Sequence, residues 1–134
     1  MIRLYVERSK SSSGKHMFRS FYIVINRSCN KLDIKPRASR PVKPLYVKGE
    51  AFEHEVDVPN EYLAVQLKFV RGLGGRVKGE ILVFNSSGSV ICRAVYRKLK
   101  VRALGCVDKS IINILTCVCS QLKIPVKKYA IIKR

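Results

Sequence analysis

The sequence predicts an α+β fold that is predominantly β: a twisted antiparallel sheet or a partly open barrel, with one C-terminal helix and an extended basic loop. Three observations lead to this prediction. Apolar residues alternate with polar ones along several segments, only one stretch has helical spacing, and one long basic segment has neither period. Because 47% of the 134 residues are hydrophobic, the chain can bury a core, and its length suits a single domain over residues 1–134.

Strands are predicted wherever apolar residues recur at every second position. The clearest segments are centred on Leu4, Ile23, Val65, Ile81 and Ala130. Residues 9–15 are rich in serine and are expected to form the loop between the first two strands. Residues 72–75 and 85–88 contain the glycines and the asparagine that are typical of hairpin tips. The strands should therefore pair mainly as antiparallel neighbours.

The helix is expected between Asp108 and Leu122, because apolar residues recur there at helical spacing. Asp108 can cap the first turn, and Pro125 prevents the helix from continuing. Apolar residues surround most of this segment, so the helix should be buried against the sheet. The chain should then return as a final strand over residues 126–134.

A long basic segment over residues 26–44 has no strand or helix period. It contains three prolines, which remove backbone donors and favour extended conformations, and five cations between Lys31 and Lys43. Loops of this length without secondary structure are usually functional or disordered. We predict that this segment is ordered only along an anionic surface.

Cysteine usage and the N-terminus bear on the cellular compartment. The five cysteines are an odd number without a Cys-x-x-Cys pair, so the sequence predicts buried free thiols rather than a disulfide framework or a zinc site. The N-terminus lacks the continuous apolar region of a signal peptide. No segment has the roughly 20 nearly uncharged residues of a membrane-spanning helix. We therefore expect a cytoplasmic protein without a membrane partner.

Charge is the most unusual property of the chain. Its 27 lysines and arginines exceed its 9 aspartates and glutamates by 18. From Tyr62 onward there are 15 basic residues, and the only acids are Glu80 and Asp108. Such an excess repels itself unless an anionic partner neutralises it, and nucleic-acid phosphates are the commonest such partner. The sequence therefore predicts a folded basic body that binds a polyanion.

The candidate nucleic-acid-binding residues are cations in patterned positions. Three groups stand out: the cations of the basic segment, those that frame the glycines at 72–75, and one strand on which Lys98, Lys100 and Arg102 alternate with apolar residues. Cations close to that strand and at the C-terminus complete the set. We expect phosphate contacts from Lys31, Lys35, Arg37, Arg40, Lys43, Arg71, Arg76, Lys78, Arg93, Arg97, Lys98, Lys100, Arg102, Lys127 and Lys128.

Groups for catalysis or for a metal are few. The chain has only two histidines, and no catalytic residue, metal or cofactor is predicted. Glu53, Glu55 and Asp57 alternate along an expected strand and could share a divalent cation on one face. Five of the nine acids lie between Glu50 and Glu61, however, and a charged strand that discourages edge pairing needs no metal. We treat this acidic segment as a candidate contact for a neighbouring protein.

The predicted function is that of a non-enzymatic structural RNA-binding protein. Small size, strong basic charge and an extended basic segment with prolines are similar to ribosomal proteins as a class. We therefore expect a component of a ribosome, or of another stable ribonucleoprotein, that contacts rRNA phosphates. Aromatic residues make up only 8% of the chain, which favours recognition of backbone and shape over base stacking. Two alternatives stay open: a DNA-binding chromatin or viral protein, and a small metal-dependent nuclease.

Overall fold

The computed structural model describes residues 1–9, 17–44, 49–71, 76–106 and 110–132, which form ten strands and one helix. Alternating segments become strands because one side of each strand meets the core and the other does not. Helix α1 spans Ser110–Gln121. The strands are β1 Ile2–Ser9, β2 Met17–Asn26, β3 Lys31–Leu32, β4 Ala38–Val42, β5 Gly49–Val56, β6 Tyr62–Arg71, β7 Val77–Phe84, β8 Val90–Arg97, β9 Lys100–Leu104 and β10 Lys128–Ile132.

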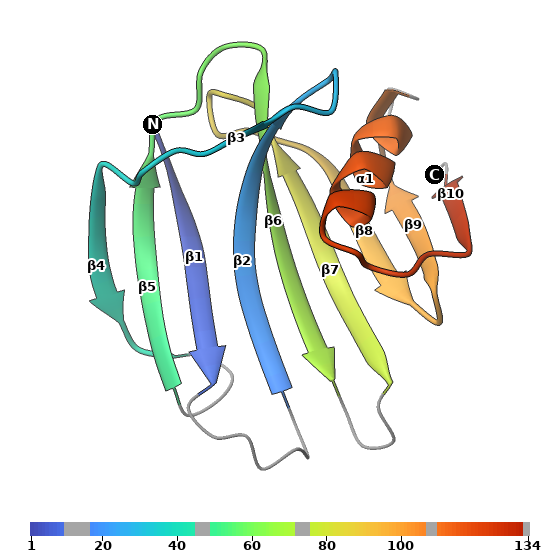
Figure 1. Cartoon of the computed structure of the whole chain (residues 1–134), viewed down its shortest axis with the longest axis horizontal. Helices are drawn as coiled ribbons and strands as arrows, with labels where there is room; N and C mark the ends of the chain where they lie inside the picture. The colour runs from blue at the N-terminus through green and yellow to red at the C-terminus, as the bar shows by residue number, and fades with distance from the viewer. Residues whose placement is uncertain (10–16, 45–48, 72–75, 107–109, 133–134) are drawn as a thin grey trace.

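The strands form one open sheet, and α1 lies on one face of its right-hand half (Figure 1). The strand order is β10-β9-β8-β7-β6-β2-β1-β5-β4, and β3 pairs with β2. All neighbours are antiparallel except β10 and β9, which run parallel because α1 connects their ends. The predicted fold class, predominantly β with one C-terminal helix, is confirmed, and the sheet is open rather than closed into a barrel.

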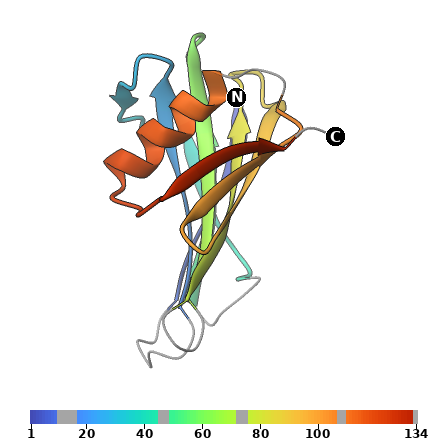
Figure 2. The same ribbon diagram turned by 90° about the vertical axis from the view of Figure 1, so that its right-hand side faces the viewer.

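The main core lies between α1 and the inner face of β2 and β6 to β9. Figure 2 shows α1 packed along one side of the sheet. Ile111, Leu115 and Val118 of the helix are buried with apolar residues of these strands, as the helical spacing predicted. The helix ends where Lys123 adopts a left-handed φ of 56°, and the backbone N of Ile124 donates to Cys119 O at 2.8 Å. The predicted cap at Asp108 lies outside the described residues.

The expected hairpin tip at residues 85–88 is confirmed between β7 and β8. Asn85 Oδ1 accepts hydrogen bonds from the backbone N of Ser87 at 3.1 Å and of Ser89 at 2.9 Å. Gly88 has a φ of 91°, which a residue with a side chain rarely adopts. The other expected tip, at residues 72–75, and most of the loop expected at residues 9–15 lie outside the described residues.

The sheet forks between β1 and β2. These strands are paired only at Glu7 with Ser20 and at Arg8 with Arg19, and beyond that point they separate. A second core fills the fork, formed by apolar residues of β1, β2, β5 and β6. The Tyr22 hydroxyl forms a 2.8 Å hydrogen bond with His54 Nδ1 across it, and burial lowers the pKa of His54. The strands β1, β5 and β4 therefore pack as a partly separate layer.

Four of the five cysteines are paired, so the prediction of free thiols is wrong for them. Cys29 in the turn after β2 is bonded to Cys117 of α1, with a Cα–Cα distance of 5.7 Å. Cys92 of β8 is bonded to Cys106 beyond β9, with a Cα–Cα distance of 5.0 Å. Spacing along the chain could not reveal these pairs, because packing of α1 on the sheet brings Cys29 and Cys117 together, and pairing of β8 with β9 brings Cys92 and Cys106 together. Cys119 is the free, buried thiol.

The disulfides lead to a thiol count that can be measured. We expect unfolded, non-reduced protein to react with a thiol reagent at one cysteine, and reduced protein at all five. In the folded protein Cys119 should not react, because burial both covers it and raises the pKa of its thiol. Five reactive thiols before reduction would contradict the pairing. Disulfides are typical of oxidising compartments, so the same count on protein from its native source tests the predicted cytoplasmic location.

Candidate nucleic-acid interface

Four cations form a row across neighbouring strands, on the sheet face opposite α1. Lys78 of β7 is the register partner of Arg97 of β8. Arg97 is in turn the partner of Lys100 of β9, which is the partner of Lys128 of β10. Direct partners project from the same face, and all four residues are exposed. With neighbouring strands about 4.8 Å apart, the row is roughly 14 Å long.

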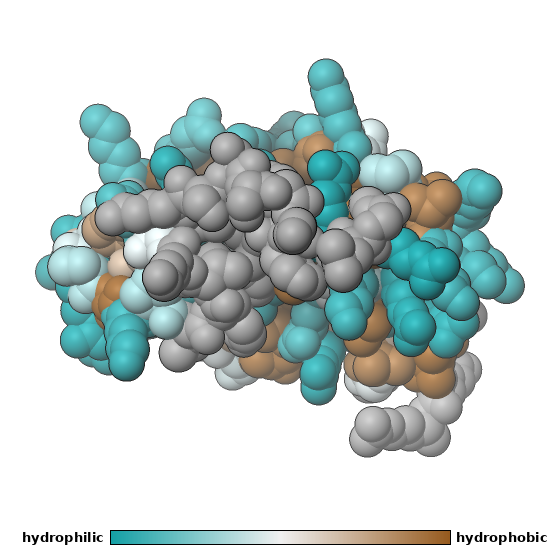
Figure 3. All heavy atoms as spheres, turned by 90° about the horizontal axis from the view of Figure 1, so that it is seen from below, coloured by the Kyte–Doolittle hydropathy of each residue, from teal (hydrophilic) through white to brown (hydrophobic). Residues whose placement is uncertain are grey.

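Further cations extend this row into a cationic face. Lys68, Arg93 and Arg102 alternate with residues that are buried under α1, such as Tyr96 and Val101. Seen from below, hydrophilic side chains lie around the edge of the molecule, including the right-hand end, where β7 to β10 lie (Figure 3). We define the cationic face as Lys68, Lys78, Arg93, Arg97, Lys100, Arg102 and Lys128.

Charge on the cationic face is poorly compensated within the chain. In the described part of β6 to β10, the only acid is Glu80, and its Oε1 lies 3.2 Å from Arg93 Nε. The row itself contains three adjacent like-charge pairs, and like charges directly opposite each other destabilise a sheet. An anion with several regularly spaced charges relieves this repulsion across the whole row at once. A chain of phosphates has that property.

The expected single strand through Lys98, Lys100 and Arg102 is wrong at its first residue. β8 ends at Arg97, and Lys98 and Leu99 form a hairpin tip with φ values of 51° and 61°. Two consecutive positive φ values define a type I′ turn, which normally contains Asn-Gly, so the sequence carries no recognisable turn signal here. The hairpin places Arg97 opposite Lys100 and so creates the centre of the row.

The sequence suggested that the basic segment over residues 26–44 is a free arm, whereas in the structure it is paired with the sheet. It contains β3, which pairs with β2, and β4, which pairs with β5. Pro41 is tolerated because β4 is an edge strand, where a missing backbone donor costs little. This segment is therefore ordered by the protein itself. Three of its five predicted cations form ion pairs: Lys31 with Asp33 at 3.8 Å, Arg37 with Asp57 at 3.9 Å, and Arg40 with Glu53 at 3.1 Å.

Three of the five acids of the acidic segment, Glu53, Glu55 and Asp57, form ion pairs within the chain. Arg3 Nε lies 3.7 Å from a carboxylate oxygen of Glu53 and 3.7 Å from one of Glu55. These two glutamates do share a face of β5, as the alternation predicted. Among the described residues, however, no three His, Cys, Asp or Glu side chains are grouped as ligands for a metal. The acids hold β1 and β4 to β5, and a contact with a neighbouring protein stays a prediction.

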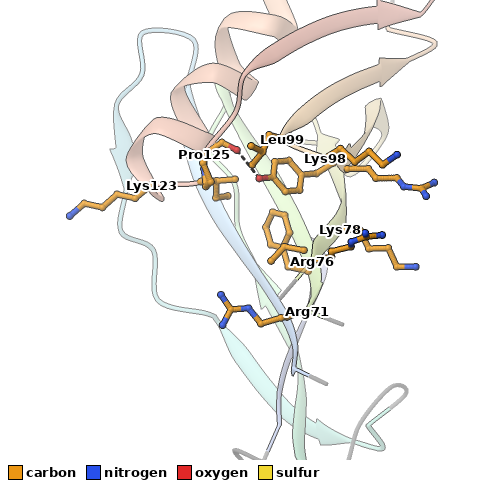
Figure 4. A pocket seen from close by; sticks show the side chains of 12 residues that line it. Arg71, Arg76, Lys78, Lys98, Leu99, Lys123 and Pro125 are labelled. Carbon is orange, nitrogen blue, oxygen red and sulfur yellow. Dashed lines mark hydrogen bonds between the residues drawn. The ribbon is translucent and has the colours of Figure 1, made fainter. Parts of the chain in front are cut away.

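A cleft of about 980 Å³ opens beside the row, where the ends of β6 to β8 meet the turn after α1 (Figure 4). The cleft has an apolar wall and a cationic rim. The sequence predicted five of the six rim cations as binding residues, but it did not predict the wall, because Phe69 and Tyr96 alternate along their strands as core residues do. The apolar wall consists of Phe69, Val77, Tyr96, Leu99, Ile124 and Pro125. The rim carries Arg71, Arg76, Lys78, Arg97, Lys98 and Lys123.

The last predicted cation, Lys127, lies beside the β8–β9 hairpin. Its backbone N donates to Leu99 O at 2.7 Å, which ties the segment before β10 to the hairpin tip. Its side chain is exposed. The structure therefore brings together ten of the fifteen predicted residues, namely those from Arg71 onward, around the cationic face and the cleft. The other five lie in the segment over residues 26–44, whose strands pair with β2 and β5.

Comparison of this chain with known protein families, with curated proteins and with solved structures finds no match. Within the described residues, no helix has the length and apolar character needed to cross a membrane. Function is therefore inferred from the geometry of the cationic face.

Proposed function

We propose that the protein binds RNA by laying the phosphate backbone along its cationic face. The observation that carries this proposal is the in-register row of Lys78, Arg97, Lys100 and Lys128. These exposed like charges repel one another in the free protein and gain a common counter-charge in the complex. The cations belong to paired strands, so their backbone positions are set before binding and only their side chains have to be ordered on the phosphates.

The experiment is a salt series on a folded RNA hairpin, with a DNA duplex of equal length beside it. If the row neutralises at least four phosphates, log affinity should fall linearly with log salt, with a slope of about −3 or steeper. A flat dependence would contradict phosphate binding. Tighter binding of the DNA duplex at every salt concentration would replace RNA by DNA as the partner, in line with the chromatin or viral alternative.

We also propose that this binding is structural rather than catalytic, as in a ribosome or another stable ribonucleoprotein. Support comes from the small basic domain and from the ion pairs that occupy Glu53, Glu55 and Asp57, the carboxylates a nuclease centre would need. The native protein should then co-sediment with ribosomal subunits or another large particle in high salt. Recovery in the soluble fraction alone would contradict the ribonucleoprotein assignment, and Mg²⁺-dependent RNA cleavage would contradict the non-enzymatic one.

A further inference from the structure

The wall of the cleft presents an aromatic ring that its neighbours hold in place. Phe69 is half-buried, and its ring packs edge-on against Tyr96, with 5.7 Å between the ring centroids. Its register partner on β7 is Gly79, where a Cβ atom would lie only 2.4 Å from Phe69 Cδ1. The glycine thus allows the phenyl ring to lie across β7. The Phe69 ring therefore provides a fixed, flat apolar surface on the wall of the cleft.

The opposite wall is fixed by the end of α1. Tyr96 is almost fully buried, and its hydroxyl donates to Pro125 O at 2.7 Å (Figure 4). The left-handed turn at Lys123 directs Ile124 and Pro125 towards the sheet, where both line the cleft. The Tyr96 hydroxyl is used internally, so the Phe69 ring is the aromatic surface left for a ligand.

All the charged residues that the described part of the chain contributes to the cleft are cations. Lys78 and Arg97 also belong to the row, so positive charge continues from the cationic face into the cleft without interruption. Figure 4 shows Lys78 and Lys98 extending to one side of the cleft and Arg71 to the other. A ligand here must therefore combine negative charge with a flat apolar part.

A nucleotide combines a negatively charged phosphate with a flat base. Only a nucleotide that is not base-paired can present that base to a protein. Bases within a duplex are stacked, whereas a bulged or single-stranded base can leave the helix at low cost and stack on an aromatic ring. The cleft volume lies within the range of sites for small ligands. We propose that the cleft binds one unpaired nucleotide of the RNA, with its base on Phe69 and its phosphate among the cations of the rim. This inference rests on the proposed RNA binding.

The test compares two RNA hairpins of equal phosphate number, one fully paired and one with a single bulged nucleotide, at one salt concentration. The unaltered protein should bind the bulged hairpin about tenfold more tightly, which is the size of effect expected for stacking one base. Phe69→Leu keeps an apolar side chain of similar size but removes the aromatic face, so it should abolish the preference and leave affinity for the paired hairpin unchanged. Phe84→Leu, a matched change in the second core, should keep the preference.

A second measurement keeps the proposal testable if Phe69→Leu does not fold. With 2-aminopurine as the bulged base, binding of the unaltered protein should change its fluorescence, whereas the same probe within the paired stem should not respond. Equal affinity for both hairpins, or an unresponsive bulge, would overturn the cleft assignment while leaving phosphate binding in place. Loss of binding to both hairpins would instead overturn the proposed function.

Discussion

Replacing Lys78, Arg97, Lys100 and Lys128 together by glutamine should weaken RNA binding at least about a hundredfold at physiological salt, because four charge-assisted phosphate contacts are lost. The slope of log affinity against log salt should become shallower by about 3, since roughly 0.7 to 0.9 counterions are released for each phosphate neutralised. The melting temperature should stay the same or rise, because the change also removes three adjacent like-charge pairs. Titration by fluorescence anisotropy over a salt series, with a thermal melt, measures all three.

The matched control neutralises four cations of the segment over residues 26–44, which belong neither to the cationic face nor to the rim of the cleft. Changing Lys31, Lys35, Arg40 and Lys43 to glutamine lowers the net charge by the same four units. If the position of the charges decides binding, this variant should keep most of the affinity and of the salt slope. Equal losses in the two variants would mean that net charge alone attracts the RNA and that the row has no special role.

The largest stability effect is expected at Gln66, which is only 4% exposed. Its Nε2 carries two hydrogens and lies 2.8 Å from Tyr5 O, 3.0 Å from Ser20 Oγ and 2.9 Å from Phe21 O, so that two of these acceptors share one hydrogen, and its Oε1 accepts from the backbone N of Tyr5 at 3.2 Å. The side chain thus joins β6 to β1 and β2 at the point where the sheet forks. Gln66→Leu removes four hydrogen bonds in a place with little access for water, so the free energy of unfolding should fall by about 3 kcal/mol or more.

A second glutamine provides the control for this prediction. Gln121 also donates to a backbone oxygen, Cys29 O at 2.7 Å, but it is exposed, so water can replace the lost partner. Gln121→Leu should therefore cost less than about 1 kcal/mol. Urea unfolding of both variants measures the difference, and similar losses would show that Gln66 does not join the two layers in the way described.

Local patterns predicted most of the elements because each depends on neighbours along the chain. The alternation centred on Leu4, Ile23, Val65 and Ile81 became β1, β2, β6 and β7, and the helical spacing became α1. Patterns failed where a distant element changed the environment. Gln66 lies on the side of β6 that the alternation assigns to polar residues, yet it is buried because β1 packs over it.

The sequence predicted only part of the candidate site, because local patterns place residues on a face but do not align them across strands. Lys100 and Arg102 could be placed on one exposed face from alternation alone. The alignment of Lys100 with Lys78 and Lys128 depends on strand register, which the left-handed turn at Lys98 sets and which no Asn-Gly pair signals in the sequence. The aromatic wall of the cleft likewise needed the cross-strand contact of Phe69 with Gly79.

The amino-acid sequence by itself determined that this chain is strongly basic and mostly β, since composition and short-range periodicity depend on no contact between distant residues, and it predicted an anionic partner. The tertiary structure decided which cations act together. Ion pairs with Asp33, Asp57 and Glu53 engage Lys31, Arg37 and Arg40, whereas strand register aligns the cations of β7 to β10 without an acid in their row. Charge is a property of residues, but a binding surface is a property of their spacing, and only pairing between distant strands fixes that spacing.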